Sequence, residues 1–449
     1  MKIFSFQNIL LALAFIVLVL IAIFIQPTYI VGLLVLIFCV WLLSRSLIWG
    51  IYLMVFFFPF ISLQINFGFG VNLPIVDILA LGVFVGWIFR MLFDKSMRPA
   101  KFPGLIYFLG FFLVGALSII NVSDFGESGL WLVSLKYLLR PIVFFYLMFV
   151  VLPFNIIKKE KQVINILGIF YSLGILISLM GLWSAFFMRS IGSVIPRAIP
   201  FEIFGILPLG VNHNLIAETL IVIIPLAWIL IKKAKDFSIK FWLSIGGLVM
   251  ALTTFLTFSR AGWIVLFIEI MAIIYYEYLR TKKFKKLNKS NLVFVISLFL
   301  IILIFLGFFM YTLLTSPITA SSNENRMEMI RIVQEVNSKH PLIGQGVGTF
   351  QRIVSYDYVY MLSFGSTIDA HGFVQKIIAE TGFLGLLAFA SIIIYIFKTI
   401  YSAYKKDKTN YVLFGLLIAV LGAFVFQLFN TSYYISKLWL IVGVALVAV

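Results

Sequence analysis

Long apolar stretches separated by short polar ones run through most of the 449-residue chain. A helix that crosses a bilayer needs about 17–25 mostly apolar residues. The pattern predicts an all-α polytopic membrane protein with about 12–14 transmembrane helices, fourteen if every soft boundary separates two spans. The predicted spans are residues 8–25, 29–44, 47–63, 77–93, 103–120, 130–152, 163–187, 213–231, 239–257, 261–279, 291–314, 377–397, 411–428 and 432–448.

One long polar interval interrupts this pattern, and it contains two of the three histidines. We expect chemistry at a membrane surface to be placed in such an interval. The chain then divides into N-terminal transmembrane helices, central transmembrane helices with an arginine hairpin, an outward-facing loop with short helices, and C-terminal transmembrane helices. These four parts are residues 1–187, 188–314, 315–376 and 377–449.

Composition supports the membrane assignment. Hydrophobic residues make up 63% of the chain and charged residues 11%, against about 25% charged residues in soluble domains. The first apolar run lacks a small-residue cleavage site, so we interpret it as a retained helix. The one cysteine, Cys39, lies inside an apolar run, which excludes a disulfide framework or a thiolate metal site.

The formal net charge of +17 is explained by membrane topology. If the N-terminus faces the cytosol, most lysines and arginines fall on every second loop, on the inner side, as the positive-inside rule requires. We therefore expect both termini in the cytosol and residues 315–376 outside. This distribution leaves no basic surface that would indicate a nucleic-acid partner.

Within the long loop, the sequence predicts an amphipathic helix. Asn323 is a suitable N-cap, Met327, Ile330 and Val333 recur at helical spacing, and Pro341 marks the end. The glycine-rich stretch 344–348 that follows predicts an irregular turn. A phosphate-binding nest is the alternative, but the strand before and the helix after a nucleotide loop are missing.

Arginines on the outer side are candidates for binding an anion, because the planar guanidinium forms two parallel hydrogen bonds to a phosphate. Arg260, in a tight turn between two spans, is the strongest candidate, with a snorkelling interfacial side chain as the alternative. Arg326 near the start of the loop helix is the second. Arg331 and Arg197 are secondary candidates, and we expect Arg331 to be solvated or paired with Glu328 or Glu335.

Two further cations lie in the predicted span 130–152. Lys136 and Arg140 are four residues apart and share a helix face. Charges within a membrane need a polar partner or a water-filled cavity. A lipid headgroup, Glu218 or Glu269 could supply that partner, and structural pairing is the favoured interpretation.

A histidine with a pKa near 6.5 is the usual general base at neutral pH. His371 is the favoured base, because it precedes a span and Asp369 is close enough to orient its ring. We interpret His340 as the end of the loop helix and His213 as a cap of its span, and both stay secondary. The histidines are scattered, and no His-x-x-x-His or Asp-x-Asp pattern occurs, so we expect no metal site.

Four motifs in this order resemble the O-antigen ligase and polymerase family of integral membrane glycosyltransferases, over about residues 200–395. They are Asn214-x-x-Ala217 at the start of a span, Ser259-Arg260-Ala261-Gly262 between two spans, Arg326 before His340-Pro341-Leu342-Ile343-Gly344-x-Gly346, and His371 followed by Glu380-x-Gly382-x-x-Gly385. The chain departs from the family at Gly372, where asparagine is usual, and at Ile330, where tryptophan is common.

The resemblance implies a function. Such enzymes move a glycan from an undecaprenyl diphosphate donor to an acceptor hydroxyl on the outer face of the bacterial inner membrane, with no cofactor, nucleotide sugar or metal ion. The acceptor is lipid A-core in the ligases and a lipid-linked repeat unit in the polymerases. We expect Arg260 and Arg326 to bind the donor diphosphate, Asn214 to be a secondary site residue, and His371 to accept the acceptor proton.

Two alternatives remain at this stage. The sequence does not separate a ligase from a polymerase, and the single long loop favours the ligase. A transporter of a lipid-linked glycan or a small anion would also suit many spans. Against it, no internal repeat or pair of broken helices is present, and the polar residues gather on one side of the membrane.

Overall fold

The computed structural model describes residues 46–66, 72–93, 100–127, 129–188, 196–203, 205–280, 307 and 317–449. The prediction of an all-α polytopic membrane protein is confirmed, because seven helices among the described residues are long and apolar enough to cross a membrane. Two predicted spans, 8–25 and 29–44, lie outside the described residues, as does 291–314 apart from residue 307. The seven are Ile75–Leu92, Leu105–Phe125, Leu130–Ile156, Glu160–Phe187, Asn214–Lys233, Phe237–Leu256 and Phe373–Lys406.

Helix α9 (Asn214–Lys233) lies in the centre of the bundle. It packs against α8 (Glu160–Phe187), α10 (Phe237–Leu256) and α17 (Tyr411–Gln427). Every residue from Ile216 to Ile229 is buried, as expected for a helix that is apolar on nearly all sides. The helices around α9 therefore hold it in place along most of its length.

The predicted span 47–63 is wrong at its end. Helix α3 (Leu47–Phe57) stops at Phe57 because Pro59 has no N–H to donate to the preceding turn, although Phe58 itself keeps helical angles (φ −58°, ψ −31°). A short antiparallel pair follows that the sequence pattern did not predict. Its strands are β1 (Gln64–Asn66) and β2 (Asn72–Pro74), with Gln64 opposite Pro74.

The span around Pro141 is continuous but locally widened. Helix α6 (Leu130–Tyr137) leads into two π-helical segments, η2 (Leu138–Phe144) and η3 (Tyr146–Val151), and then into α7 (Leu152–Ile156). A proline removes one backbone donor, and a wider turn accommodates that loss. The remaining elements of the bundle are α3 (Leu47–Phe57), α4 (Ile75–Phe93), α5 (Leu105–Ser118), η1 (Ile119–Phe125), α11 (Arg260–Ile274), η4 (Tyr275–Arg280), α16 (Phe373–Lys406) and α18 (Ser436–Val447).

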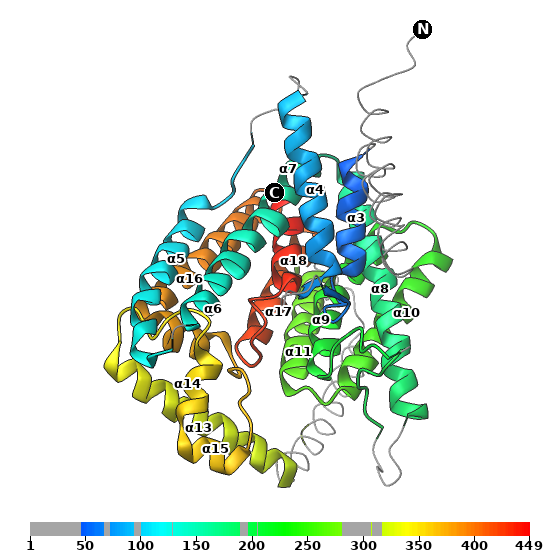
Figure 1. The fold of residues 1–449 in the computed structure, drawn as a ribbon. Coiled ribbons are helices and arrows are strands. Elements are labelled where there is room, and N and C mark those ends of the chain that lie inside the picture. The colour runs from blue at the N-terminus through cyan, green and yellow to red at the C-terminus, as the bar shows by residue number, and fades with distance from the viewer. Residues whose placement is uncertain are drawn as a thin grey trace, which may run out of the picture.

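The loop between α11 and α16 carries three helices, α13 (Pro317–Lys339), α14 (Phe350–Tyr356) and α15 (Tyr358–Phe364). They form a layer at the end of the molecule opposite the C-terminus (Figure 1). The layer has its own hydrophobic core, which links the three helices to the start of α16. That core consists of Met329, Ile332, Val333, Phe350, Ile353, Val354, Tyr360, Ala370 and Ala379.

Two details of the predicted loop helix are corrected. The helix begins at Pro317, a residue that is well suited to a first helical position, so Asn323 lies inside the helix and is not its N-cap. The buried face contains Met329 and Ile332, whereas Met327 is 66% exposed. The predicted end before Pro341 is confirmed.

Helix α16 is bent at Gly382, whose φ of 65° and ψ of −166° are not helical. The backbone of the loop pairs with this bend. The N–H groups of Gln345 and Gly346 donate to the carbonyls of Ala379 and Glu380, each at 2.9 Å, and Phe383 N–H donates to the Pro341 carbonyl at 2.9 Å. We call this pairing of residues 341–346 with 379–384 the clasp.

Two of the three motif glycines of the clasp, Gly344 and Gly382, make close backbone contacts. A Cβ on Gly382 would lie 2.4 Å from the Leu342 carbonyl carbon, and one on Gly344 would lie 2.5 Å from the carbonyl carbon of Glu380. Both glycines also have positive φ, which favours glycine. The two glycine motifs, which are distant in sequence, thus form one structure that anchors the loop on α16.

Candidate active site

The hairpin between α10 and α11 presents Arg260. Ser259 caps α11, and its Oγ accepts a hydrogen bond from the Gly262 N–H at 3.3 Å. A Cβ on Gly262 would lie 3.0 Å from the Cβ of Ala217, so α11 approaches α9 closely at this point. Phe258 has a φ of 59°, the one positive value among the described non-glycine residues. Such strain persists where the surrounding structure holds a functional residue in place.

Arg260 is connected to the loop layer. Its Nη1 donates to Oδ1 of Asn323 at 3.0 Å, so the turn between α10 and α11 contacts α13. One helical turn further along α13 is Arg326, whose Nε is buried without a hydrogen-bond partner among the described residues. Burial and the nearby Arg260 charge lower the pKa of Arg326.

His371 lies within electrostatic reach of both arginines. Burial lowers its pKa to about 4, and the charges of Arg326 and then Arg260 act in the same direction, whereas Asp369 opposes them weakly. The structure thus brings together the three residues that the sequence singled out. The pKa of His371 is therefore lower than the value near 6.5 expected from the sequence, because an imidazolium here would be poorly solvated and next to two cations.

Arg331 has different surroundings from Arg326. Its guanidinium contacts Glu328, Glu335 and Asp357, with Nη2 2.6 Å from the Asp357 carboxylate. Hydrogen bonds to Glu328 and Asp357 raise its pKa. The expected pairing with Glu328 and Glu335 is present, and the third carboxylate, Asp357, ties α13 to the start of α15.

His340 and Asp369 are both held by other residues. His340 Nε2 lies 2.8 Å from the Asp124 carboxylate, at the end of α13 as expected. Asp369 accepts a hydrogen bond from the buried Lys376 Nζ at 2.7 Å, and it also interacts with the hydroxyl of Tyr434. Asp369 therefore affects His371 through the negative charge of its carboxylate, which raises the pKa of the imidazole slightly.

The backbone on both sides of His371 is fixed by the connection between α17 and α18. Thr431 Oγ1 donates to the Ala370 carbonyl at 2.6 Å. A Cβ on Gly372 would lie 2.4 Å from the Leu428 carbonyl oxygen. The asparagine that the resemblance leads one to expect at this position does not fit without a shift of that connection, which gives the glycine a physical reason.

The glycine-rich stretch 344–348 is a turn, as expected. Its amides are occupied: those of Gln345 and Gly346 bind the bend of α16, and Val347 N–H donates to Ser118 Oγ at 3.1 Å. Glu380 accepts from Phe350 N–H at 3.1 Å. The phosphate-nest alternative is therefore wrong, because these donors are already satisfied.

Sequence reasoning gave no site role to Lys376 and named Glu218 only as a possible partner of Lys136 and Arg140. Lys376 is buried and forms ion pairs with Asp369 and Glu380, at 2.7 and 3.2 Å. Glu218 on α9 accepts from Gln427 Nε2 at 2.8 Å and from Ser432 Oγ, and so holds the α17–α18 connection. A lysine and a glutamate four residues apart near an apolar run were a usable signal for the first pair.

A second group of secondary candidates lies at the start of α9. Arg197 Nη2 is 2.9 Å from His213 Nε2, and Arg197 Nε donates to the Thr257 carbonyl at 3.3 Å. Asn214 is the first residue of α9, and its N–H donates to Asn212 Oδ1 at 2.9 Å. Burial and the Arg197 charge lower the pKa of His213 to about 4, so its ring is neutral at pH 7.

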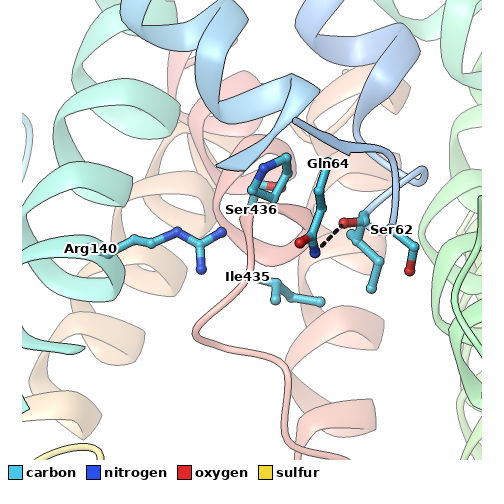
Figure 2. A pocket seen from close by; sticks show the side chains of 7 residues that line it. Ser62, Gln64, Arg140, Ile435 and Ser436 are labelled. Carbon is cyan, nitrogen blue, oxygen red and sulfur yellow. Dashed lines mark hydrogen bonds between the residues drawn. The ribbon is translucent and has the colours of Figure 1, made fainter. Parts of the chain in front are cut away.

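A cavity of about 130 Å³ lies beside Arg140, between the β1–β2 pair and the start of α18. Figure 2 shows the side chains that line it. Arg140 Nε and Nη2 donate to Asp77 Oδ2 at 3.0 and 2.7 Å. The favoured interpretation of Arg140, structural pairing, is thus confirmed, with Asp77 as a partner that was not anticipated. Because a carboxylate already compensates this arginine, the cavity is a poor anion site.

The described residues contain no group of three or more His, Cys, Asp or Glu side chains that could hold a metal ion. The fold and the site together define a polytopic helical membrane protein with two partly buried arginines and a neutral histidine gathered where a folded loop meets the bundle. Residues 245–390 match the family model of the O-antigen ligase, so the chain carries an O-antigen ligase domain. This segment includes Arg260, Arg326 and His371. Among curated proteins, none matches the chain.

Proposed function

We propose that this protein transfers a glycan from an undecaprenyl diphosphate donor to an acceptor hydroxyl, on the outer face of the bacterial inner membrane, with inversion at the anomeric carbon. One observation carries the proposal. Arg260 bonds to Asn323, one helical turn from Arg326, and no described carboxylate pairs with either arginine. Both charges lower the pKa of His371, and the Arg260 charge lowers the pKa of Arg326. A diphosphate would supply the missing negative charge.

The reaction divides between these groups. The acceptor oxygen attacks the anomeric carbon, the bond from that carbon to the diphosphate oxygen breaks, and the acceptor proton passes to His371. Negative charge grows on the leaving diphosphate, and arginines aimed at it stabilise the transition state. The proton on His371 then leaves to the departing diphosphate or to water, which restores the neutral base.

His371 suits this role better when the donor is bound. In the free protein its low pKa makes it a weak base, although it stays neutral. A bound diphosphate would compensate Arg260 and Arg326, and the pKa of the imidazole would rise toward its ordinary value. A base is more effective when its pKa approaches the working pH. Donor binding would therefore activate the base.

Lipid A-core is the proposed acceptor, which makes the protein a ligase. The test uses the purified protein, an undecaprenyl diphosphate-linked glycan, and either lipid A-core or a second copy of the donor as acceptor. We expect glycan on lipid A-core. Chains that lengthen only on the lipid carrier would identify a polymerase, and vectorial movement of the donor without a new glycosidic bond would identify a transporter.

The same preparation tests the metal-independent mechanism. We expect transfer to continue in excess EDTA. Loss of transfer that Mg²⁺ or Mn²⁺ restores would contradict the mechanism. The proposed location is tested in intact spheroplasts, where cysteines placed at Ser322 and Ser355 should react with an impermeant thiol reagent. Labelling only after lysis would place the site on the cytosolic face.

A further inference from the structure

Arg197 resembles Arg260 and Arg326 in one respect that separates these three from other arginines on the same side. Arg331 and Arg352 each contact at least one carboxylate, Arg352 through Glu127. Arg197 has no carboxylate partner among the described residues. Its two hydrogen bonds go to a backbone carbonyl and to an imidazole nitrogen. Its charge is therefore uncompensated, and its side chain is exposed.

The pairing with His213 holds Arg197 in one orientation. His213 Nε2 faces a guanidinium, which only donates, so this nitrogen accepts and the ring proton is on Nδ1. The guanidinium carbon also lies 6.0 Å from the centre of the Phe258 ring. Two of the five guanidinium N–H groups are used in these hydrogen bonds, and three remain for a ligand.

Arg197 and His213 form a group of their own. Arg197 contacts Thr257 and Phe258, at the α10 end of the hairpin, whereas Arg260 at the α11 end contacts Asn323 on α13. The pKa values of the two histidines are also lowered by different arginines. Arg197 lowers the pKa of His213, and Arg326 and Arg260 lower the pKa of His371. The two ends of the hairpin thus contact two different cationic groups.

Glycosyl transfer needs two substrates that approach the anomeric carbon from different directions. If the Arg260 group binds the donor diphosphate, a second cationic group across the hairpin is placed for an anionic group of the other substrate. We propose that Arg197, held by His213 and the Thr257 carbonyl, is a second anion subsite that binds a phosphate of the acceptor lipid. This inference rests on the proposed function, because it assigns the donor to the other group.

The test measures binding of three lipids to the purified full-length protein in detergent: undecaprenyl diphosphate, lipid A and enzymatically dephosphorylated lipid A. Native mass spectrometry gives the number of bound copies, and a titration gives the affinities. The variants are R197A, R260A and the matched control R352A, which removes an outer arginine that is already paired. R197Q gives the same measurement if R197A does not fold.

We expect R197A to weaken acceptor-lipid binding by about 10- to 100-fold, because a hydrogen bond to a charged group is lost. The affected ligand identifies the source of the phosphate: lipid A for a ligase, or a second copy of undecaprenyl diphosphate for a polymerase. Binding of the first copy of undecaprenyl diphosphate should stay unchanged in R197A and be lost in R260A. Dephosphorylated lipid A should bind wild type and R197A equally, and R352A should behave as wild type.

Two results would overturn the inference. If R197A and R260A weaken the same first copy of undecaprenyl diphosphate, Arg197 belongs to the donor site. If R197A changes the affinity for none of the lipids, it is not an anion subsite. Failure of the proposed function gives a different result, because R260A would then leave undecaprenyl diphosphate binding intact whatever R197A does.

Discussion

Arg326 and Arg331 lie five residues apart on the same helix, yet their surroundings are opposite. Arg331 contacts three carboxylates, and these raise its pKa. Arg326 has a buried Nε without a partner among the described residues, and burial and another arginine lower its pKa. Two cations held close together at the edge of a membrane repel each other, and this raises the free energy of the folded protein unless an anion binds between them.

The comparison separates two uses of arginine within one loop. Arg331 ties α13 to α15 through Asp357 and so stabilises the loop layer. In the proposed function, Arg326 and Arg260 instead bind the donor diphosphate. If this distinction holds, changes at the two positions should affect different quantities, activity in one case and stability in the other.

The largest expected effect is on transfer. We expect R326A and R260A each to lower kcat by about 10²–10³-fold, the usual cost of losing one donor to a developing charge. Lysine at either position should restore little activity, because a point charge does not replace the planar fork. R331A is the control and should keep near-normal kcat. Steady-state rates with the lipid-linked donor decide this, and an inactive R331A beside an active R326A would reverse the comparison.

A second large effect is expected at His371. Loss of a general base typically costs about 10²–10⁴-fold in rate, so H371A should lose at least about 10²-fold while still binding the donor. His340 is paired with Asp124 at the end of α13, and H340A should lose less. Donor binding and turnover are measured for both variants. A dead H340A with an active H371A would move the base to the other histidine.

The pH dependence should differ between the free and the donor-bound protein. The base works when neutral, and the pKa of His371 in the free protein is about 4. The donor kcat/KM, which reports the free protein, should therefore fall only as the pH drops toward about 4. The kcat should fall at a higher pH, because the bound diphosphate raises the pKa of the imidazole. If kcat and kcat/KM fell at the same pH, the proposed activation of His371 by the bound donor would be contradicted.

A smaller effect is expected from asparagine at position 372. G372N introduces a Cβ against the Leu428 carbonyl oxygen, so the α17–α18 connection must shift and carry Thr431 and the Ala370 carbonyl with it. We expect a lower kcat with an unchanged KM for the donor. G129N is the matched control, since nothing lies within 4 Å of its Cβ position and its φ of −92° suits any residue. Equal kcat values for G372N and wild type would show that the α17–α18 connection can shift without affecting the reaction.

The smallest effect is on stability. Arg331 is about one third exposed, and exposed ion pairs contribute about 0.2–1 kcal/mol each at most. R331A should therefore lower the temperature at which the loop layer becomes protease-sensitive by a few degrees. R326A should leave that temperature unchanged or raise it, since it removes a buried, uncompensated charge. Limited proteolysis on heating distinguishes them.

Much of this arrangement could be predicted from the sequence, because it depends on local signals. Apolar runs located the described spans, and residue type located Arg260, Arg326 and His371. The environment of each residue could not be predicted, since it depends on contacts between distant segments. Nothing near Gly372 in sequence indicates the Leu428 carbonyl. Burial of Met329 in place of Met327 depends likewise on α14 and α15 packing against α13.

The clasp has a consequence for how enzymes of this kind can diversify. The segment from Thr349 to Ile368 is fixed at one end by the backbone pairing with α16 and at the other by the α17–α18 connection. Lengthening a closed loop costs little, about 0.6 kcal/mol for each doubling. Insertions there can reshape the surface presented to a glycan while His371 stays in place. New substrate preferences can thus arise by exchanging one stretch of chain.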